Sequence, residues 1–222
     1  MKKISIEKEL FDLFCDKDSC FEQYQKPFLD IGHNEVWATN KHMAVVVKAE
    51  LVSEKYQKWK IKGPTLGTPC NTIVTLKAIK DALAKLPMVE EEEIEDVDCD
   101  ECDGIGKVEC EYVDKGGTIH DVTADCPICF GSGYVEGEPK KTGEMTVDFS
   151  TPIKLGEAYF MGYRLNTLAQ AMELIGFERL TMTHHGHGYG KGKACELQAD
   201  GVRFFLAPML VDDVQNVIEI EL

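Results

Sequence analysis

Two matching cysteine repeats are the residues of this sequence best suited to chemistry. Cys99 and Cys102 open the first repeat, Cys126 and Cys129 open the second, and both repeats follow the pattern C-x-x-C-x-G-x-G. Four thiolates are the ligand set of a structural zinc ion, because zinc takes soft ligands in a closed tetrahedron. The glycines suit a chain folded tightly around a metal, since they accept positive φ at little cost. We therefore predict one structural Zn²⁺ bound by these four cysteines.

The alternative interpretation is a set of reduced or disulfide-bonded structural cysteines, which would leave the repeat unexplained. Cys110 lies between the two repeats and is a rival ligand, although it has no partner at metal spacing. The chain has nine cysteines, an odd number, and their zinc-like spacing suits a reducing cytoplasm better than a disulfide framework. A four-cysteine zinc site is coordinatively closed and does not activate water, so we predict that the metal has no catalytic role.

The cysteine repeat resembles the cysteine-rich zinc domain of DnaJ-type chaperones. In that domain two C-x-x-C-x-G-x-G units share each zinc, and four units bind two zincs. This chain has two units, so the resemblance implies one zinc. It covers 35 residues, from Cys99 to Gly133, and no J-domain signature occurs elsewhere in the sequence. A co-chaperone activity is therefore not implied.

Composition indicates a soluble globular protein without a membrane partner. Of 222 residues, 44% are hydrophobic and 28% are charged, and no apolar run approaches the roughly 18 residues of a membrane-spanning helix. The net charge of −15 argues against a protein coated with nucleic acid. Ten of the fourteen residues from Glu90 to Asp103 are acidic. We interpret this run as a solvated linker that leads into the zinc segment, in preference to a Ca²⁺ or Mg²⁺ site.

Hydrophobic periodicity and turn signals predict an α+β fold of antiparallel sheets with helices on one face. The expected helices span residues 5–14, 76–86 and 164–175. The expected strands span 28–31, 35–39, 43–48, 72–75, 144–149, 178–183, 195–199 and 202–207, with an edge strand after 214. A hairpin of 107–113 and 118–122 is expected inside the zinc segment. We predict a body of residues 1–95 and 138–222, interrupted by a zinc-binding insertion of residues 96–137.

The segment from Val36 to Ala44 resembles the bacterial β sliding clamp. The clamp has a strand-turn-strand of the form A-T-D-G-H-R-L-A. The matching residues are Ala38, Thr39 and His42, and the departures are Asn40, Lys41 and Met43.

A second stretch resembles the last repeat of the clamp. Residues 163–171 are similar to its Y-L-L-D-A-L helix, and Pro208 and Met209 match its closing M-P-M. The two stretches occur in clamp order. The resemblance implies a DNA-clamp fold with helices inside and antiparallel sheet outside, a role with DNA, a replication or repair protein as partner, and assembly into a homo-oligomer. A ring needs six domains, and this chain would supply one or one and a half.

One basic segment carries the nucleic-acid prediction. Its residues are Lys55, Lys58, Lys60 and Lys62, with Tyr56 and Trp59 interleaved. Lysines can bind phosphates and aromatic rings can stack on bases. A solvated strand with two anchoring aromatic residues is the alternative interpretation.

Three functional hypotheses follow. The first is a non-catalytic, clamp-like protein of DNA metabolism whose zinc insertion presents a surface to a partner protein or nucleic acid. The second is a zinc-dependent interaction module that has the clamp fold and does not encircle DNA. The third is an enzyme that uses His184, His185 and His187, which lie in a glycine-rich loop. We expect that the protein is not an enzyme.

Overall fold

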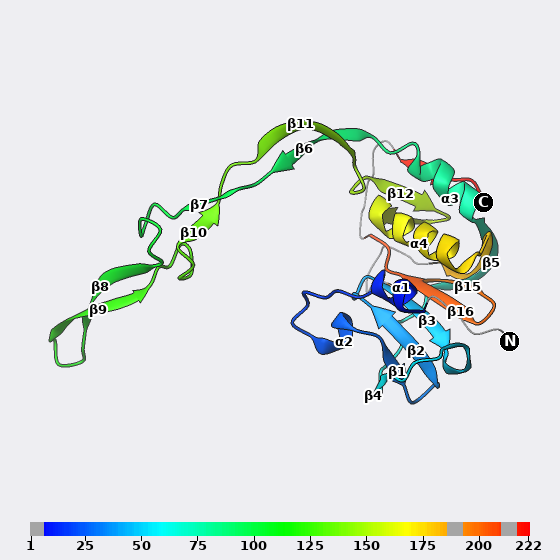
Figure 1. Cartoon of the computed structure of the whole chain (residues 1–222), viewed down its shortest axis with the longest axis horizontal. Coiled ribbons are helices and arrows are strands. Elements are labelled where there is room, and N and C mark those ends of the chain that lie inside the picture. Colours follow the sequence, from blue (N-terminus) through cyan, green and yellow to red (C-terminus); the bar gives the residue numbers. More distant parts are fainter. Residues whose placement is uncertain (1–6, 186–192, 210–216) are drawn as a thin grey trace. The chain divides into compact units, whose positions relative to one another are not determined.

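The computed structural model describes residues 7–185, 193–209 and 217–222. It divides into two compact units, one formed by Met1–Pro87 with Val147–Leu222 and the other by Met88–Thr146 (Figure 1). The second unit contains the cysteine repeats. It is longer at both ends than the insertion of 96–137 expected from the sequence, because strands on either side of the cysteines pair with each other.

An eight-stranded sheet organises the first unit. Its strand order is β4-β1-β2-β3-β16-β15-β14-β5. The strands are β1 (Phe28–Asp30), β2 (Glu35–Thr39), β3 (Met43–Lys48), β4 (Gln57–Trp59), β5 (Thr68–Thr75), β14 (Arg179–His185), β15 (Cys195–Ala199) and β16 (Val202–Leu206). The β15–β16 hairpin turns at Asp200 and Gly201, which have φ values of 45° and 86°. This confirms the hairpin predicted from Asp-Gly.

Two strand pairs are parallel, so the expectation of purely antiparallel sheets was wrong in detail. β4 runs parallel to β1 at one edge of the large sheet. A second, three-stranded sheet contains β12 (Pro152–Leu155), β13 (Ala158–Met161) and β17 (Ile218–Ile220), and β17 runs parallel to β12. Both parallel strands are short edge segments that are joined to their partner strands by long connections. No βαβ pattern in the sequence predicts either pairing.

Three helices share one core with one face of the large sheet. They are α1 (Glu7–Asp12), α3 (Leu76–Leu83) and α4 (Gly162–Ile175), and their buried side chains join those of the strands in a single cluster. The Thr75 hydroxyl caps α3 by accepting from the amide of Ala78, and Gly176 ends α4 with φ 81°. The predicted helices are therefore present, and their described ends lie within three residues of the predicted ends. A short α2 (Glu22–Gln25) and a 3₁₀ turn (Ala49–Leu51) complete the unit.

The opposite face of the large sheet carries its own apolar cluster. Along β3, Val45 and Val47 join the core with the helices, whereas Ala44 and Val46 join the second cluster. In that cluster the rings of Trp37 and Phe205 stack with centroids 5.5 Å apart. Both faces of the sheet therefore bury apolar side chains, although α1, α3 and α4 cover only one.

The second unit is built from paired strands around the cysteines. It contains β6 (Met88–Glu93) paired with β11 (Lys140–Val147), β7 (Asp96–Asp98) paired with β10 (Tyr134–Glu136), and a hairpin of β8 (Lys107–Val113) and β9 (Ile119–Asp125). The β8–β9 hairpin confirms the sequence prediction. Its turn is held by Asp114, whose carboxylate accepts from the amides of Gly116 and Thr118 at 2.8 and 2.9 Å.

The acidic run is solvated, as we expected, because all but one of its ten acidic residues are exposed. It is not an irregular linker, since half of its fourteen residues lie in the paired strands β6 and β7. Two lysines of the partner segment offset part of its charge: Lys140 pairs with Glu95 at 2.6 Å and Lys141 pairs with Glu90 at 3.1 Å. The sequence prediction treated the acidic and basic segments separately, and their pairing across about 50 residues went unnoticed. No helix in the described part of the chain is long and apolar enough to cross a membrane.

Candidate metal centre

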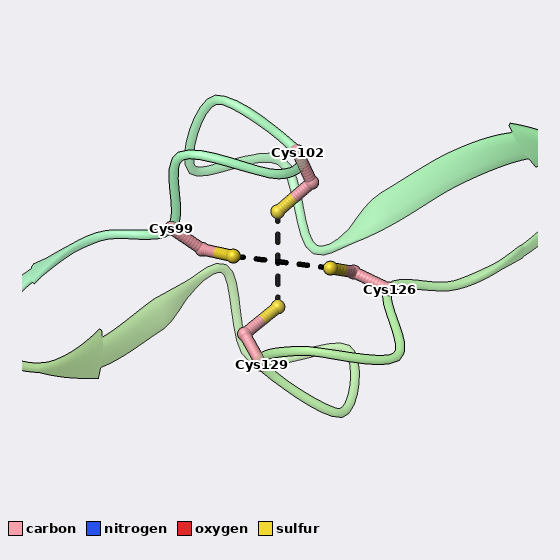
Figure 2. A group of neighbouring side chains, drawn as sticks. All are labelled: Cys99, Cys102, Cys126 and Cys129. Carbon is pink, nitrogen blue, oxygen red and sulfur yellow. Dashed lines mark hydrogen bonds between the residues drawn. The ribbon is translucent and has the colours of Figure 1, made fainter.

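The four predicted cysteines meet at one point in the second unit. Their side chains are buried, and the four sulfur atoms lie within 4.8 Å of one another. Figure 2 shows the sulfurs directed at a common centre, with Cys99 opposite Cys126 and Cys102 opposite Cys129. The two opposed pairs are separated by 3.8 and 3.7 Å. The arrangement could bind one metal ion.

The sulfur spacing fits a tetrahedral metal site. A tetrahedron with metal–sulfur bonds of about 2.3 Å has edges of about 3.8 Å. A disulfide would bring two sulfurs to about 2.05 Å, and none of these four cysteines forms one. The disulfide alternative for these four residues is therefore excluded.

Each repeat forms the same hydrogen-bonded loop around its second cysteine. The amide of Gly106 donates to Cys102 Sγ and the amide of Gly133 donates to Cys129 Sγ, both at 3.2 Å. These bonds span four residues in each repeat, so they require the C-x-G-x-G spacing read in the sequence. Amide donors favour the thiolate form of a cysteine, which is the form that binds metal.

The two loops also brace each other. The amide of Cys99 donates to the carbonyl of Gly133 at 2.8 Å, and the amide of Cys126 donates to the carbonyl of Gly106 at 2.9 Å. A Cβ on Gly133 would lie 2.3 Å from the carbonyl oxygen of Gly104, and a Cβ on Gly106 would lie 2.4 Å from that of Gly131. The last glycine of each repeat is therefore required by the backbone of the other repeat.

The repeat is one residue longer than we recognised from the sequence. Asp98 precedes the first cysteine of one repeat and Asp125 precedes that of the other. Their carboxyl oxygens lie 3.0 and 3.1 Å from the position of a Cβ on Gly104 and on Gly131, respectively. The shared D-C dipeptide was visible in the sequence, but only the fold shows that each aspartate packs on its own glycine.

Burial and hydrogen bonding shift the thiol pKa values in opposite directions. Burial raises the pKa of Cys102 to about 12 and also raises that of Cys99. Burial acts in the same direction on Cys129, but the amides of Gly133 and Gly131 and the neighbouring thiols lower its pKa to about 6. One thiolate is thus favoured before a cation binds, and a cation must displace protons from Cys99 and Cys102.

Metal affinity should therefore fall as the pH is lowered. Each thiol proton that the metal displaces weakens apparent binding about tenfold per pH unit. With protons displaced from Cys99 and Cys102, we expect at least a hundredfold loss of apparent affinity from pH 8 to pH 7. Competition with a chelator of known pH dependence measures this slope. An affinity that stays constant between these pH values would show that the cysteines are not the ligands.

Cys110 is not part of the cluster. It lies on β8, its side chain is exposed, and its Sγ contacts the carbonyl of Val122 at 3.7 Å. The position of Cys110 in the hairpin therefore excludes it as a ligand of this cluster.

The predicted nucleic-acid segment lies at the edge of the large sheet of the first unit. Lys55, Lys58, Lys60 and Lys62 are exposed, and no ion pair joins any of them to another residue in the described ranges. Tyr56 and Trp59 anchor the segment. The Tyr56 hydroxyl donates to Glu7 at 3.2 Å, and the Trp59 ring packs 6.4 Å from that of Phe28. Trp59 is thus partly an anchoring side chain, as the alternative interpretation expected.

The histidines of the third hypothesis are only partly described. His184 and His185 end β14, whereas His187 lies outside the described residues. The Nδ1 atom of His184 lies 2.9 Å from a carboxylate oxygen of the buried Glu196. Glu196 also contacts Arg203 at 3.2 Å, so the described part of this cluster is a hydrogen-bonded network on the sheet.

Comparison with known proteins finds similarity to solved structures. No protein-family model matches the chain, and no curated protein matches it. A solved structure of DNA polymerase III subunit beta from Borrelia burgdorferi, in complex with a natural product, is similar with a TM-score of 0.42 and 10% sequence identity. The similarity covers 96% of this chain and 62% of that chain, so this chain spans less than two thirds of its length.

Proposed function

We propose that this chain is a non-catalytic, DNA-clamp-like protein of DNA metabolism whose zinc-organised insertion binds a partner protein. The observation that carries the binding role is the closed cluster of four buried sulfurs between pairs of exposed strands. A four-sulfur site leaves no open position for a substrate, so the metal serves to hold the chain. Zinc is the proposed ion, because tetrahedral four-sulfur sites select zinc or iron and zinc is the usual structural choice.

The charge of the insertion favours a basic protein as its partner. Residues 88–146 contain eighteen acidic and four basic residues, a formal net charge of −14, whereas the remaining 163 residues carry −1. A surface of this charge repels phosphate, so nucleic acid is disfavoured as the partner of the insertion. The second loop also exposes apolar side chains, with Phe130 88% exposed and Ile128 57% exposed. Exposed apolar groups among charges are typical of protein-binding surfaces.

A paired capture experiment tests the partner role. Wild-type protein and the variants Phe130→Ser and Cys126→Ser serve as baits under the same conditions. We expect a specific partner to be retained by wild type, weakened by Phe130→Ser with the metal still bound, and lost from Cys126→Ser. Equal recovery from all three baits would overturn a role for the insertion.

The clamp-like assignment of the body is supported by the position of the two resembling segments. His42 in the turn between β2 and β3 and Ala207 after β16 are 165 residues apart in the sequence. The carbonyl of His42 accepts from the amide of Ala207 at 2.8 Å, and Met43 pairs with Leu206 in the sheet. The two segments thus form one continuous part of the fold. Arg164 is buried on α4 and donates to the carbonyl of Ala207, so that cation is not available to phosphates.

The exposed lysines favour DNA as a ligand of the body. Because Lys55, Lys58, Lys60 and Lys62 have no acidic partners in the described chain, phosphates could bind them without breaking ion pairs. Replacing all four with Gln should abolish most binding at low salt. It should also reduce the slope of log affinity against log salt by up to about 3–4.

Fluorescence anisotropy of labelled DNA at several salt concentrations measures this effect. The control is Lys77→Gln with Lys80→Gln, since these lysines on α3 pair with Asp81 and Glu173. An unchanged slope in the fourfold variant would exclude the lysine segment as the DNA contact.

Whether the protein encircles DNA depends on its assembly. We propose a homo-oligomer, because a single chain has too few repeats to close a ring. Sedimentation of the metal-loaded protein should give a closed oligomer at micromolar concentration. A monomer with unchanged DNA binding would favour the second hypothesis, an interaction module that has the clamp fold and does not encircle DNA.

A further inference from the structure

A pocket lies on the face of the large sheet opposite to α1, α3 and α4. Its volume is about 440 Å³, within the range of small-molecule sites. Trp37, Phe205 and Phe28 line it from the sheet, and Ile61 and Pro64 line it from the chain that follows β4. The lining is therefore largely aromatic and apolar, and the lysine segment leads directly into it.

The pocket is electropositive in an otherwise acidic protein. Lys41, His42 and Lys62 line it, and none of the described residues that line it is acidic, although the chain has a net charge of −15. The pKa of His42 is lowered by burial, and the positive charges of Arg164 and Lys41 lower it further. The lowered pKa favours neutral His42, so the cations at this pocket are Lys41 and Lys62. No carboxylate among the described lining residues balances them, which favours an anionic ligand.

One buried donor in the pocket wall lacks an acceptor. Trp37 is 6% exposed, and its Nε1–H has no hydrogen-bond partner among the described residues. A buried donor without an acceptor is costly and is usually satisfied in a finished structure. A flat aromatic ligand would suit the aromatic part of the lining.

We propose that this pocket receives one unpaired base of a single-stranded nucleic acid, whose phosphates lie along Lys58, Lys60 and Lys62. This inference rests on the DNA contact in the proposed function and adds the form of nucleic acid that is bound. Single strands bind through cations that follow the backbone and aromatic groups that contact bases. A duplex keeps its bases stacked inside, so its bases cannot enter a pocket without being flipped out. The site therefore prefers a single strand.

Fluorescence of Trp37 reports occupancy of the pocket. The chain has two tryptophans, so Trp59→Phe leaves Trp37 as the single emitter. The probe is a 12-nucleotide oligodeoxythymidylate, which has no secondary structure. We expect it to quench Trp37 and to bind at least tenfold more tightly than a 12-base-pair duplex at the same salt.

A variant whose pocket is blocked tests whether the base binds there. Thr65 is exposed and lines the pocket, so Thr65→Phe should occupy its mouth without disturbing the core. We expect Thr65→Phe to remove the preference for the single strand and the quenching of Trp37. Thr123→Phe, on exposed strand β9 of the other unit, is the control and should change neither.

The outcomes separate this inference from the proposed function. Equal affinity for single strand and duplex, lost from the fourfold lysine variant, would keep the DNA contact and overturn the base pocket. Quenching by free thymidine monophosphate but not by the oligonucleotide would assign the pocket to a free nucleotide and also overturn it. No binding of either DNA form would overturn both proposals.

Discussion

Replacing Cys126 with Ser should release the metal and unfold residues 88–146 while the large sheet survives. Cys126 is fully buried among the other three sulfurs, and three ligands leave an incomplete site. The strands of this unit are mostly exposed and bury little apolar surface apart from the cysteines, Val108 and Val135. Structural zinc contributes about 10–16 kcal/mol of apparent binding energy in small zinc-finger peptides, and that energy is also folding energy. Nothing else in this unit replaces it.

The other unit should keep its fold in this variant, because its main core contains no residue from 88–146. Elemental analysis should find one zinc per wild-type chain and none in Cys126→Ser. Hydrogen exchange should show loss of protection confined to the insertion. Cys110→Ser is the control, since this exposed cysteine lies in the same unit outside the cluster, and it should retain the metal. Metal retained by Cys126→Ser, or loss of the whole fold, would contradict the proposed division of the chain.

Replacing Gly133 with Ala should weaken metal binding by a factor of about 100 or more, which corresponds to roughly 3 kcal/mol. Gly133 has φ 85°, a conformation that costs an alanine about 1–2 kcal/mol. Its Cβ would also lie 2.3 Å from the carbonyl oxygen of Gly104, and this oxygen belongs to the backbone of the facing loop. The two loops would have to separate, and the sulfurs would separate with them.

The control variant Gly117→Ala separates the effect of backbone strain from that of the contact between a Cβ at residue 133 and the carbonyl oxygen of Gly104. Gly117 has φ 84° in the turn of the β8–β9 hairpin, and a Cβ there meets nothing within 4 Å. The backbone strain is therefore similar in the two variants, and only Gly133 contacts the other repeat. Chelator competition should give nearly wild-type affinity for Gly117→Ala. Equal losses in the two variants would mean that backbone strain alone accounts for the effect.

Nearly all of the net negative charge lies in the second unit, which limits the partners that each unit can bind. An insertion of net charge −14 is compatible with a body that binds nucleic acid only if the two surfaces use different partners. The lysine segment and the electropositive pocket belong to the first unit, and the cysteine loops with exposed Phe130 belong to the second. We expect mutations in one surface to leave binding at the other intact, which the DNA and capture experiments together can measure.

The elements that followed from local sequence signals were predicted well. Asp200 and Gly201 form the expected turn, Gly176 ends α4, and the four cysteines meet because ligand spacing and glycines are encoded within each repeat. The acidic run is solvated as predicted, but its strand pairing was not foreseen, because its basic partner strand lies about 50 residues away. The edge strand at the end of the chain was predicted, but the parallel pairings of β4 and β17 were missed for the same reason.

The sequence by itself determined the four cysteines of the candidate metal site, because each pair and its glycines lie within eight residues and the required turn is local. It also determined most helices and hairpins, through periodicity and turn residues. Only the tertiary structure decided which distant segments meet. It placed His42 beside Ala207, brought Trp37 against Phe205, and put the end of the lysine segment at an aromatic pocket. Such contacts depend on strand order and on which face of a sheet is covered, and these are set by packing of the whole unit.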